Sequence, residues 1–239
     1  MKLAFLGTRG EIEKRTKRHG LHTALLATYR RRRVMIDCGR DWLGRIGGVG
    51  PHAIVLTHAH PDHAWGLADG ARAPVYATAE TRELLADYPL DWGRVLKPGR
   101  SASIEGLRFE PFTVEHSTRC PAVGYRVTAG NVCIFYVPDV VYIPDSSAAL
   151  AGVKLYVGDA ASLSRPLIRK RGDRLIGHSP VRRQLAWCEK EGVPRAVFTH
   201  CGSPVVAEHN AAGRQIREWG RQRGIDAQLA YDNLEMVLR

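Results

Sequence analysis

The sequence predicts an α/β fold, and three observations point to it. Short apolar runs of strand length recur along the chain, for example at residues 53–56, 134–137 and 196–199. In the last third, segments of helical composition separate such runs, so strand and helix alternate there. The chain has 239 residues, 44% of them hydrophobic, and shows no linker or low-complexity segment. Length alone would allow two domains, but we expect a single domain that spans residues 1–239.

In the first third, residues 2–6 are predicted to form a strand and Gly7 to Gly20 a long polar loop. That loop carries five basic residues, namely Arg9, Lys14, Arg15, Lys17 and Arg18. Residues 21–29 and 34–37 form a predicted hairpin, whose turn is the run from Arg30 to Arg33. Four like charges cannot be buried together, so we expect this turn in solvent.

The middle of the chain combines strands with one helix. Residues 74–77 are predicted as a strand and residues 78–87 as a helix, with Leu84 and Leu85 on its inner face and Pro89 as its stop. Three further strands follow, at residues 107–114, 122–128 and 132–137, and a turn at 129–131 joins the last two.

The last third alternates strand and helix. Strands are predicted at residues 153–157, 195–199, 227–231 and 234–238, and helices at about 180–190 and 204–223. Ser179-Pro180 and Ser203-Pro204 are typical helix starts, because serine caps the first turn and proline suits its first position.

Composition restricts the cellular setting and the partners. The net charge of +11 comes mostly from arginine, which suits polyanionic partners. The five cysteines are odd in number and include no CxxC pair, so we expect reduced thiols. No stretch approaches the roughly 18 apolar residues of a membrane span. We therefore expect a soluble cytoplasmic protein; a homodimer is compatible with the sequence.

Four side chains that can bind metal lie within six residues, directly after the apolar run 53–56. His58 and His60 are two apart, so on an extended chain both imidazoles point to one side and can bind one cation. Asp62 and His63 follow the turn at Pro61 and can face a second cation. The competing interpretation, surface histidines in a polar loop, requires this spacing to arise by chance after a buried strand.

The seven residues from Thr57 to His63 resemble the motif of the metallo-β-lactamase superfamily, and the likeness extends over nearly the whole chain. The resemblance implies a four-layer αββα sandwich and further ligands at strand ends, for which His116, Asp139 and His200 are the candidates. It assigns His58, His60 and His116 to one metal, Asp62, His63 and His200 to a second, and Asp139 to a bridge between them. Two divalent cations, roughly 3.5 to 4 Å apart, can share a hydroxide that acts as nucleophile. Zinc is the first choice for these ligands, although manganese or iron can occupy them.

Two further segments resemble ribonuclease Z and related phosphodiesterases. Residues 121–127 contain the Gly-Tyr-Arg of one of their strands, and the segment from Gly177 to Pro180 resembles their second catalytic histidine at a helix start. The resemblance implies that His178 is a general acid for the leaving alkoxide. We expect Asp159 to be its carboxylate partner, and Asp62 to be catalytic as well as a ligand.

The chain also departs from ribonuclease Z. Asp139 stands between Pro138 and Val140, where that family has Gly-Asp-Thr, and only 23 positions separate it from His116, which leaves no room for a tRNA-docking arm. The compact layout is closer to a small phosphodiesterase that acts on a cyclic ribose phosphate.

Three functions from different classes remain open. The leading one is a dinuclear metal-dependent phosphodiesterase that acts on a small cyclic phosphate, a nucleotide or a short nucleic acid. A lactonase or thioesterase would use the same hydroxide but need no acid for the leaving group, so His178 discriminates between the two. The third function is a nucleic-acid-binding module with a vestigial site, and the positive net charge is the only observation that supports it.

Overall fold

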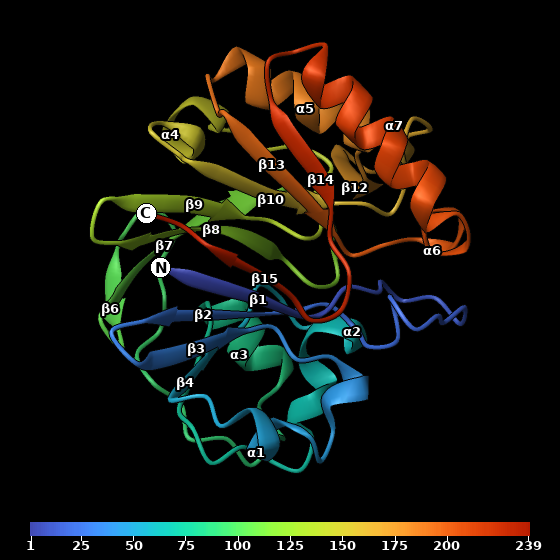
Figure 1. Cartoon of the computed structure of the whole chain (residues 1–239). Helices are drawn as coiled ribbons and strands as arrows, with labels where there is room; N and C mark the ends of the chain where they lie inside the picture. The colour runs from blue at the N-terminus through green and yellow to red at the C-terminus, as the bar shows by residue number, and fades with distance from the viewer.

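The computed structural model describes residues 1–239, and its strands form two large sheets packed face to face with helices on both outer sides (Figure 1). One sheet has six strands in the order β15-β1-β2-β3-β4-β5, and the other has seven in the order β14-β13-β10-β9-β8-β7-β6. This arrangement confirms the predicted α/β class and the four-layer sandwich.

The six-stranded sheet contains both ends of the chain. Its strands are β1 (Lys2–Gly7), β2 (Ala24–Tyr29), β3 (Arg32–Ile36), β4 (Ala53–Val55), β5 (Val75–Tyr76) and β15 (Leu234–Val237). Strand β15 pairs antiparallel with β1, so the two termini lie close together (Figure 1). Short helices cover its outer face: η1 (Arg40–Trp42), α1 (Ile46–Val49), α2 (Pro61–Ala64), η2 (Trp65–Leu67) and α3 (Ala79–Leu84).

The seven-stranded sheet contains β6 (Ala102–Ile104), β7 (Leu107–Val114), β8 (Ala122–Ala129), β9 (Val132–Tyr136), β10 (Leu155–Asp159), β13 (Arg195–Thr199) and β14 (Asp226–Leu229). Its outer helices are α4 (Ser146–Leu150), α5 (Val181–Lys190), α6 (Ser203–Ala207) and α7 (His209–Arg221). Strands β9, β10 and β13 run parallel. Because parallel strands end at one edge of a sheet, the residues that follow them, Asp139 and His200 among them, gather at that edge.

Three apolar clusters follow from the four layers. The cluster between the sheets includes Phe5, Tyr125 and Val157, the one under α5 and α7 includes Phe198 and Ile216, and a smaller one lies beneath the short helices. A hydroxyl also links the two sheets, since Tyr125 donates a hydrogen bond to the carbonyl of Leu56 over 2.8 Å. This hydrogen bond connects the two sheets at the point where the predicted metal motif begins.

Several local predictions were wrong. The helix expected at 204–223 is broken at Glu208, whose φ of −117° and ψ of 41° leave the helical region and separate α6 from α7. Pro180 and Gly202 occupy the N-cap positions of α5 and α6, and neither serine caps them. The Ser179 hydroxyl donates to the carbonyl of Val141 instead. Leu84, expected to face inward, is 50% exposed because α3 ends there.

A hairpin of β11 (Leu167–Arg171) and β12 (Arg174–His178) was not predicted. It forms a two-stranded sheet of its own, outside both large sheets. Gly177 has a φ of 113°, and a Cβ there would lie 1.9 Å from the carbonyl oxygen of Leu167, so only glycine fits. The turn at Arg30 and Arg31, by contrast, is exposed as expected.

The five cysteines are free thiols, as the sequence indicated. No helix is both long and apolar enough to cross a bilayer.

Candidate active site

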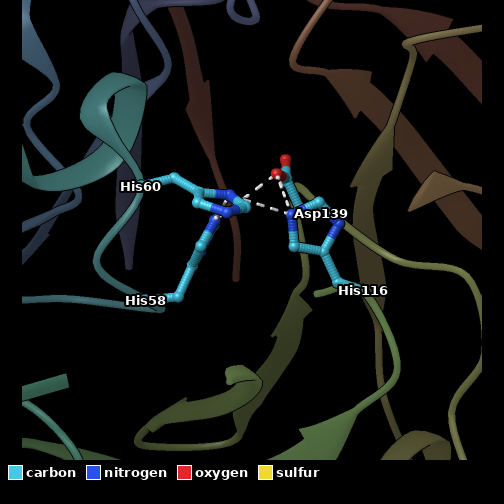
Figure 2. A group of neighbouring side chains, drawn as sticks. All are labelled: His58, His60, His116 and Asp139. Carbon is cyan, nitrogen blue, oxygen red and sulfur yellow. Dashed lines mark hydrogen bonds and ion pairs between the residues drawn. The ribbon is translucent and has the colours of Figure 1, made fainter. Parts of the chain in front are cut away.

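Four donor atoms converge where β4, β7 and β9 end. Figure 2 shows His58 and His60 approaching from one side and His116 and Asp139 from the other. Nδ1 of His60 lies 2.9 Å from Nε2 of His58 and 3.1 Å from Nε2 of His116. Oδ2 of Asp139 lies 3.5 Å from Nε2 of His58 and 3.1 Å from Nε2 of His116. All four atoms thus point at one small volume.

A second group forms around the other oxygen of Asp139. Oδ1 of Asp139 lies 3.4 Å from Nε2 of His63 and 3.1 Å from Nδ1 of His200. Oδ2 of Asp62 lies 3.4 Å from Nε2 of His63 and 2.9 Å from Nε2 of His200. Asp139 therefore presents one oxygen to each group, the geometry expected of a bridging carboxylate.

Local backbone explains how neighbouring residues reach the two groups. His60 is extended, with ψ of 154°, and Pro61 begins α2, so the chain turns directly after His60 and one helical turn carries Asp62 and His63 into the second group. His200 has a φ of 55°, in the left-handed region that residues other than glycine rarely adopt. Such strain concentrates at functional sites.

Neighbouring groups fix the ring orientation of three histidines. Nδ1 of His63 lies 3.0 Å from Oδ2 of the buried Asp37, and Nδ1 of His116 lies 3.0 Å from the carbonyl of Gly177. Nδ1 of His58 lies 3.0 Å from the hydroxyl of Thr57. A proton held on each Nδ1 leaves the Nε2 lone pair free toward the site, which a metal ligand requires.

Burial favours neutral rings in the first group. Burial lowers the pKa of His116 to about 4 against the opposing charge of Asp139. Burial and the neighbouring imidazoles hold the pKa of His58 well below its usual value. Neutral imidazole is the form that binds a cation.

The second group is dominated by carboxylates. Burial opposes protonation of His200, but Asp139, Asp159 and Asp62 outweigh it and raise its pKa to about 10. Burial also opposes protonation of His63, but the carboxylates of Asp139, Asp62 and Asp37 outweigh it and raise the pKa of His63. Since the buried acids draw positive charge to this place, a divalent cation could replace these protons.

The donor set fits two divalent cations. Three buried polar atoms of the candidate ligands have no hydrogen-bond partner within the protein: Nε2 of His63, Oδ1 of Asp139 and Nδ1 of His200. A tetrahedral ion with ligands at about 2.1 Å separates neighbouring donor atoms by about 3.4 Å, close to the spacings observed here. Nitrogen and carboxylate ligands suit zinc, manganese or iron.

His178 and Asp159 lie beside these ligands. Nδ1 of His178 is 2.7 Å from Oδ2 of Asp159, and its ring stacks on that of His200 with centroids 5.4 Å apart. The amides of Val140 and Ala161 donate to Asp159 over 3.3 and 2.7 Å, which orients its carboxylate. The Nε2 atom of His178 makes no hydrogen bond within the protein, and its side chain is 22% exposed.

A cavity of about 840 Å³ opens onto the site. Its walls include His60, Pro61, Asp62, His116, Asp139, His178 and His200. The rest of the lining comes from three segments: Gly10 to Ile12, Ala161 to Leu167 without Pro166, and Gly202 to Pro204. A substrate in this cavity would contact both the candidate ligands and His178.

The loop after β1 borders this cavity, but not through its basic residues. Gly10, Glu11 and Ile12 line the cavity. Arg9 is buried and forms an ion pair with Asp41. The remaining two arginines of the loop are held elsewhere: Arg15 pairs with Asp41 over 2.7 Å, and Arg18 contacts Asn210 over 3.2 Å.

The structure thus brings together all nine residues that the sequence singled out. Sequence analysis missed the groups that support them, above all Asp37, which also accepts hydrogen bonds from the amide and hydroxyl of Thr57. It missed Gln184 too, whose amide bonds both the amide and the carbonyl of Asp159. Asp37 follows the apolar run 34–36, the strand-end position that identified Asp139, and so carried a usable signal.

Comparisons with known proteins agree with this geometry. The sequence model of the beta-lactamase superfamily domain matches residues 32–201. None of the curated proteins matches the chain. Solved structures of similar fold include the metallo-beta-lactamase fold protein YhfI from Bacillus subtilis, with 15% identity, 98% of each chain covered and a TM-score of 0.78.

Two other similar structures are enzymes by name. One is a diphosphatase of the PhnP family, with 22% identity, 100% of this chain and 98% of that chain covered, and a TM-score of 0.71. The other is the short form of human tRNase Z, with 18% identity, 100% of both chains covered and a TM-score of 0.68. At these identities the likeness concerns the fold.

Proposed function

Because this chain belongs to the metallo-β-lactamase superfamily, we propose that it is a dinuclear metal-dependent phosphodiesterase with His178 as general acid. The match to the superfamily and the cluster of histidines and aspartates support a metal-dependent hydrolase. The pairing of His178 with Asp159 over 2.7 Å, beside that cluster, carries the choice of phosphodiester chemistry.

His178 is suited to deliver a proton. Burial opposes its protonation, but the Asp159 carboxylate outweighs burial and raises the pKa of His178. Its Nδ1 is held by Asp159, so the proton to be donated is the one on Nε2. Hydrolysis of a phosphodiester expels an alkoxide, which needs such a proton when the leaving group is poor.

The candidate ligands would supply the remaining chemistry once loaded. Two divalent cations held by His58, His60, His116, Asp62, His63, His200 and the shared Asp139 would activate a water and polarise the phosphoryl oxygens. Zinc is the metal we propose first, with manganese or iron as alternatives. Asp62 would contribute to catalysis as a ligand of the cation in the second group.

The alternatives fit these residues less well. A lactonase or thioesterase has no need of the pair of His178 and Asp159. A binding module with a vestigial site would be expected to have lost ligands, whereas all seven donor residues converge. Two neighbours of the same fold, a diphosphatase and a tRNase, direct the first tests toward phosphate esters.

A panel of chromogenic substrates tests the reaction class. Metal-loaded protein should hydrolyse a phosphodiester with a higher kcat/KM than a phosphomonoester, lactone, thioester or β-lactam. A preference for the lactone or the thioester would contradict the proposal.

His178→Ala tests the mechanism. The variant should lose on the order of 10² to 10⁴ in kcat on a phosphodiester with a poor leaving group, and much less with nitrophenolate, which departs without a proton. Metal content serves as the control, because donor atoms of His178, Asp159, Asp139 and His200 also lie within 4.8 Å of one another. Equal losses on both substrates would reject the proton-donor role, and loss of metal would make His178 a ligand.

A further inference from the structure

The hairpin of β11 and β12 concentrates exposed positive charge next to the candidate active site. Arg169, Lys170, Arg171 and Arg174 are all exposed, and none of them forms an ion pair within the protein. The hairpin begins at the cavity and returns to it, because Leu167 and His178 both line the cavity. The positive charge of the hairpin therefore extends outward from the cavity.

Strand geometry separates these charges onto two faces. Every second side chain of a strand points to the same face. Leu167 lines the cavity, so Arg169 and Arg171 lie on the face that begins there, and Lys170 lies on the opposite one. At about 3.4 Å per residue, these arginines stand about 7 and 14 Å further from the cavity than Leu167.

Strand β12 extends the same face, because directly paired residues share a face. Leu167 pairs with His178, Arg169 with Ile176 and Arg171 with Arg174. The face thus presents the catalytic candidate His178 at its base, then one arginine, then a pair of arginines. Such a row matches an anion whose charge repeats along its length, and a small cyclic phosphate would use none of it.

We propose that this face of the hairpin binds the phosphodiester backbone of a single-stranded nucleic acid and directs it into the cavity. The proposal rests on the phosphodiesterase function above and names its substrate class. A single strand is favoured because six of the seven candidate ligands are buried, all but His60, so that a wide duplex could not reach them. Leu167, 43% exposed, at the base of this face and Ile176, directly opposite Arg169, offer apolar contacts to unstacked bases.

Binding of an oligonucleotide tests the surface directly. Fluorescence anisotropy of a short labelled single strand with hydrolysis-resistant phosphorothioate linkages gives Kd for the metal-loaded protein at several salt concentrations. The triple variant Arg169→Gln/Arg171→Gln/Arg174→Gln should weaken binding about tenfold or more at low salt. It should also lower the slope of log Kd against log salt by about 2, since each phosphate contact with a single strand contributes about 0.7. An unchanged thermal unfolding midpoint would show that the variant is folded.

Two controls separate the face from net charge. Arg30→Gln/Arg31→Gln/Arg45→Gln removes the same charge from the β2–β3 turn and the start of α1, away from the hairpin (Figure 1), and should leave Kd unchanged. Within the hairpin, Lys170→Gln should weaken binding less than Arg169→Gln. Equal losses in the two triple variants, no binding by the unmodified protein, or equally tight binding of a duplex would overturn the proposal.

Hydrolysis of bis(4-nitrophenyl) phosphate by the same preparation reports on the phosphodiesterase separately. Oligonucleotide binding without this hydrolysis would retain the surface and reject the enzyme function. Hydrolysis without oligonucleotide binding would reject the surface and retain the enzyme.

Discussion

At the scale of single residues, Asp37 determines how His63 faces the site. Its Oδ2 lies 3.0 Å from Nδ1 of His63, and its Oδ1 accepts a hydrogen bond of 2.8 Å from the amide of Thr57. Both side chains of the Asp37–His63 pair are fully buried. One carboxylate therefore fixes the tautomer of His63 and the start of the segment that carries His58.

We predict that Asp37→Asn weakens metal binding about 10- to 100-fold, because an amide neither orients His63 nor makes it as basic. Asparagine keeps the size of the side chain and an oxygen for Thr57, so the fold should persist. Competition with a chromogenic chelator measures the metal affinity. The control is Asp87→Ala, which removes an exposed carboxylate shortly after the end of α3. Equal affinity in both variants would refute the role of Asp37.

At the scale of elements, a buried polar chain ties the loop after β1 to α7 and to the loop before β15. The hydroxyl of Thr8 donates to Asp232 over 2.6 Å and lies 2.7 Å from Nδ1 of His19. Nε2 of His19 in turn lies 2.8 Å from Nδ1 of His209 at the start of α7. The loop that lines the cavity is thus anchored through His19.

This anchor predicts a pH dependence of stability. Burial, with help from His209 and Arg18, lowers the pKa of His19 to about 4, from 6.5 in the unfolded chain. The folded state thus binds fewer protons, so the contribution of His19 is complete above pH 6.5 and is lost as pH falls toward 4. The free energy of unfolding should drop by up to about 3 kcal/mol over this window.

Denaturant titration of His19→Gln checks this prediction. Between pH 6.5 and 4, the variant should lose stability less steeply than the unmodified protein, because His19 no longer titrates. Some loss should remain, because other groups titrate in both proteins. His52→Gln, a histidine outside this chain of contacts, is the control and should follow the unmodified protein. Identical pH profiles for all three proteins would contradict the assignment.

At the scale of the whole molecule, the candidate metal centre joins the two halves of the sandwich. His58, His60, Asp62 and His63 follow a strand of the six-stranded sheet, whereas His116, Asp139 and His200 follow strands of the seven-stranded sheet. Each of the two donor groups draws residues from both halves. A bound cation would therefore crosslink the sheets as well as serve chemistry.

We predict about two metal ions per chain and a strong effect of metal on thermal stability. A ligand at about 100 times its Kd stabilises by about 2.7 kcal/mol per site, and each kcal/mol shifts Tm by about 2 to 4 °C in a chain of this size. Chelation should thus lower Tm by about 10 °C or more, and zinc should restore it.

Elemental analysis and scanning calorimetry measure these two quantities. Asp139→Ala is the control, because it removes the shared ligand and should make Tm insensitive to chelator. A stoichiometry of zero that neither zinc nor manganese restores would reject the metal centre.

The sequence by itself determined the fold class and which residues gather at the site. Strand runs are local, and a residue that directly follows a buried strand emerges at the sheet's edge. The resemblance to the superfamily implied ligands at such strand ends, so His116, Asp139 and His200 could be named beforehand. The pattern from His58 to His63 is local as well, because a short extended segment and one helical turn set its geometry.

Only the tertiary structure decided which charges are buried and which hairpin stands apart. Arg9 belongs to a polar loop by sequence, but it is buried in the structure, where Asp41, 32 positions later, gives it an ion-pair partner. The segment from Leu167 to His178 shows little apolar periodicity, since no core covers its faces, and so its strands left no signal. Whether a charge is buried depends on a partner that is distant in sequence. Apolar periodicity appears only in an element that packs one face against a core.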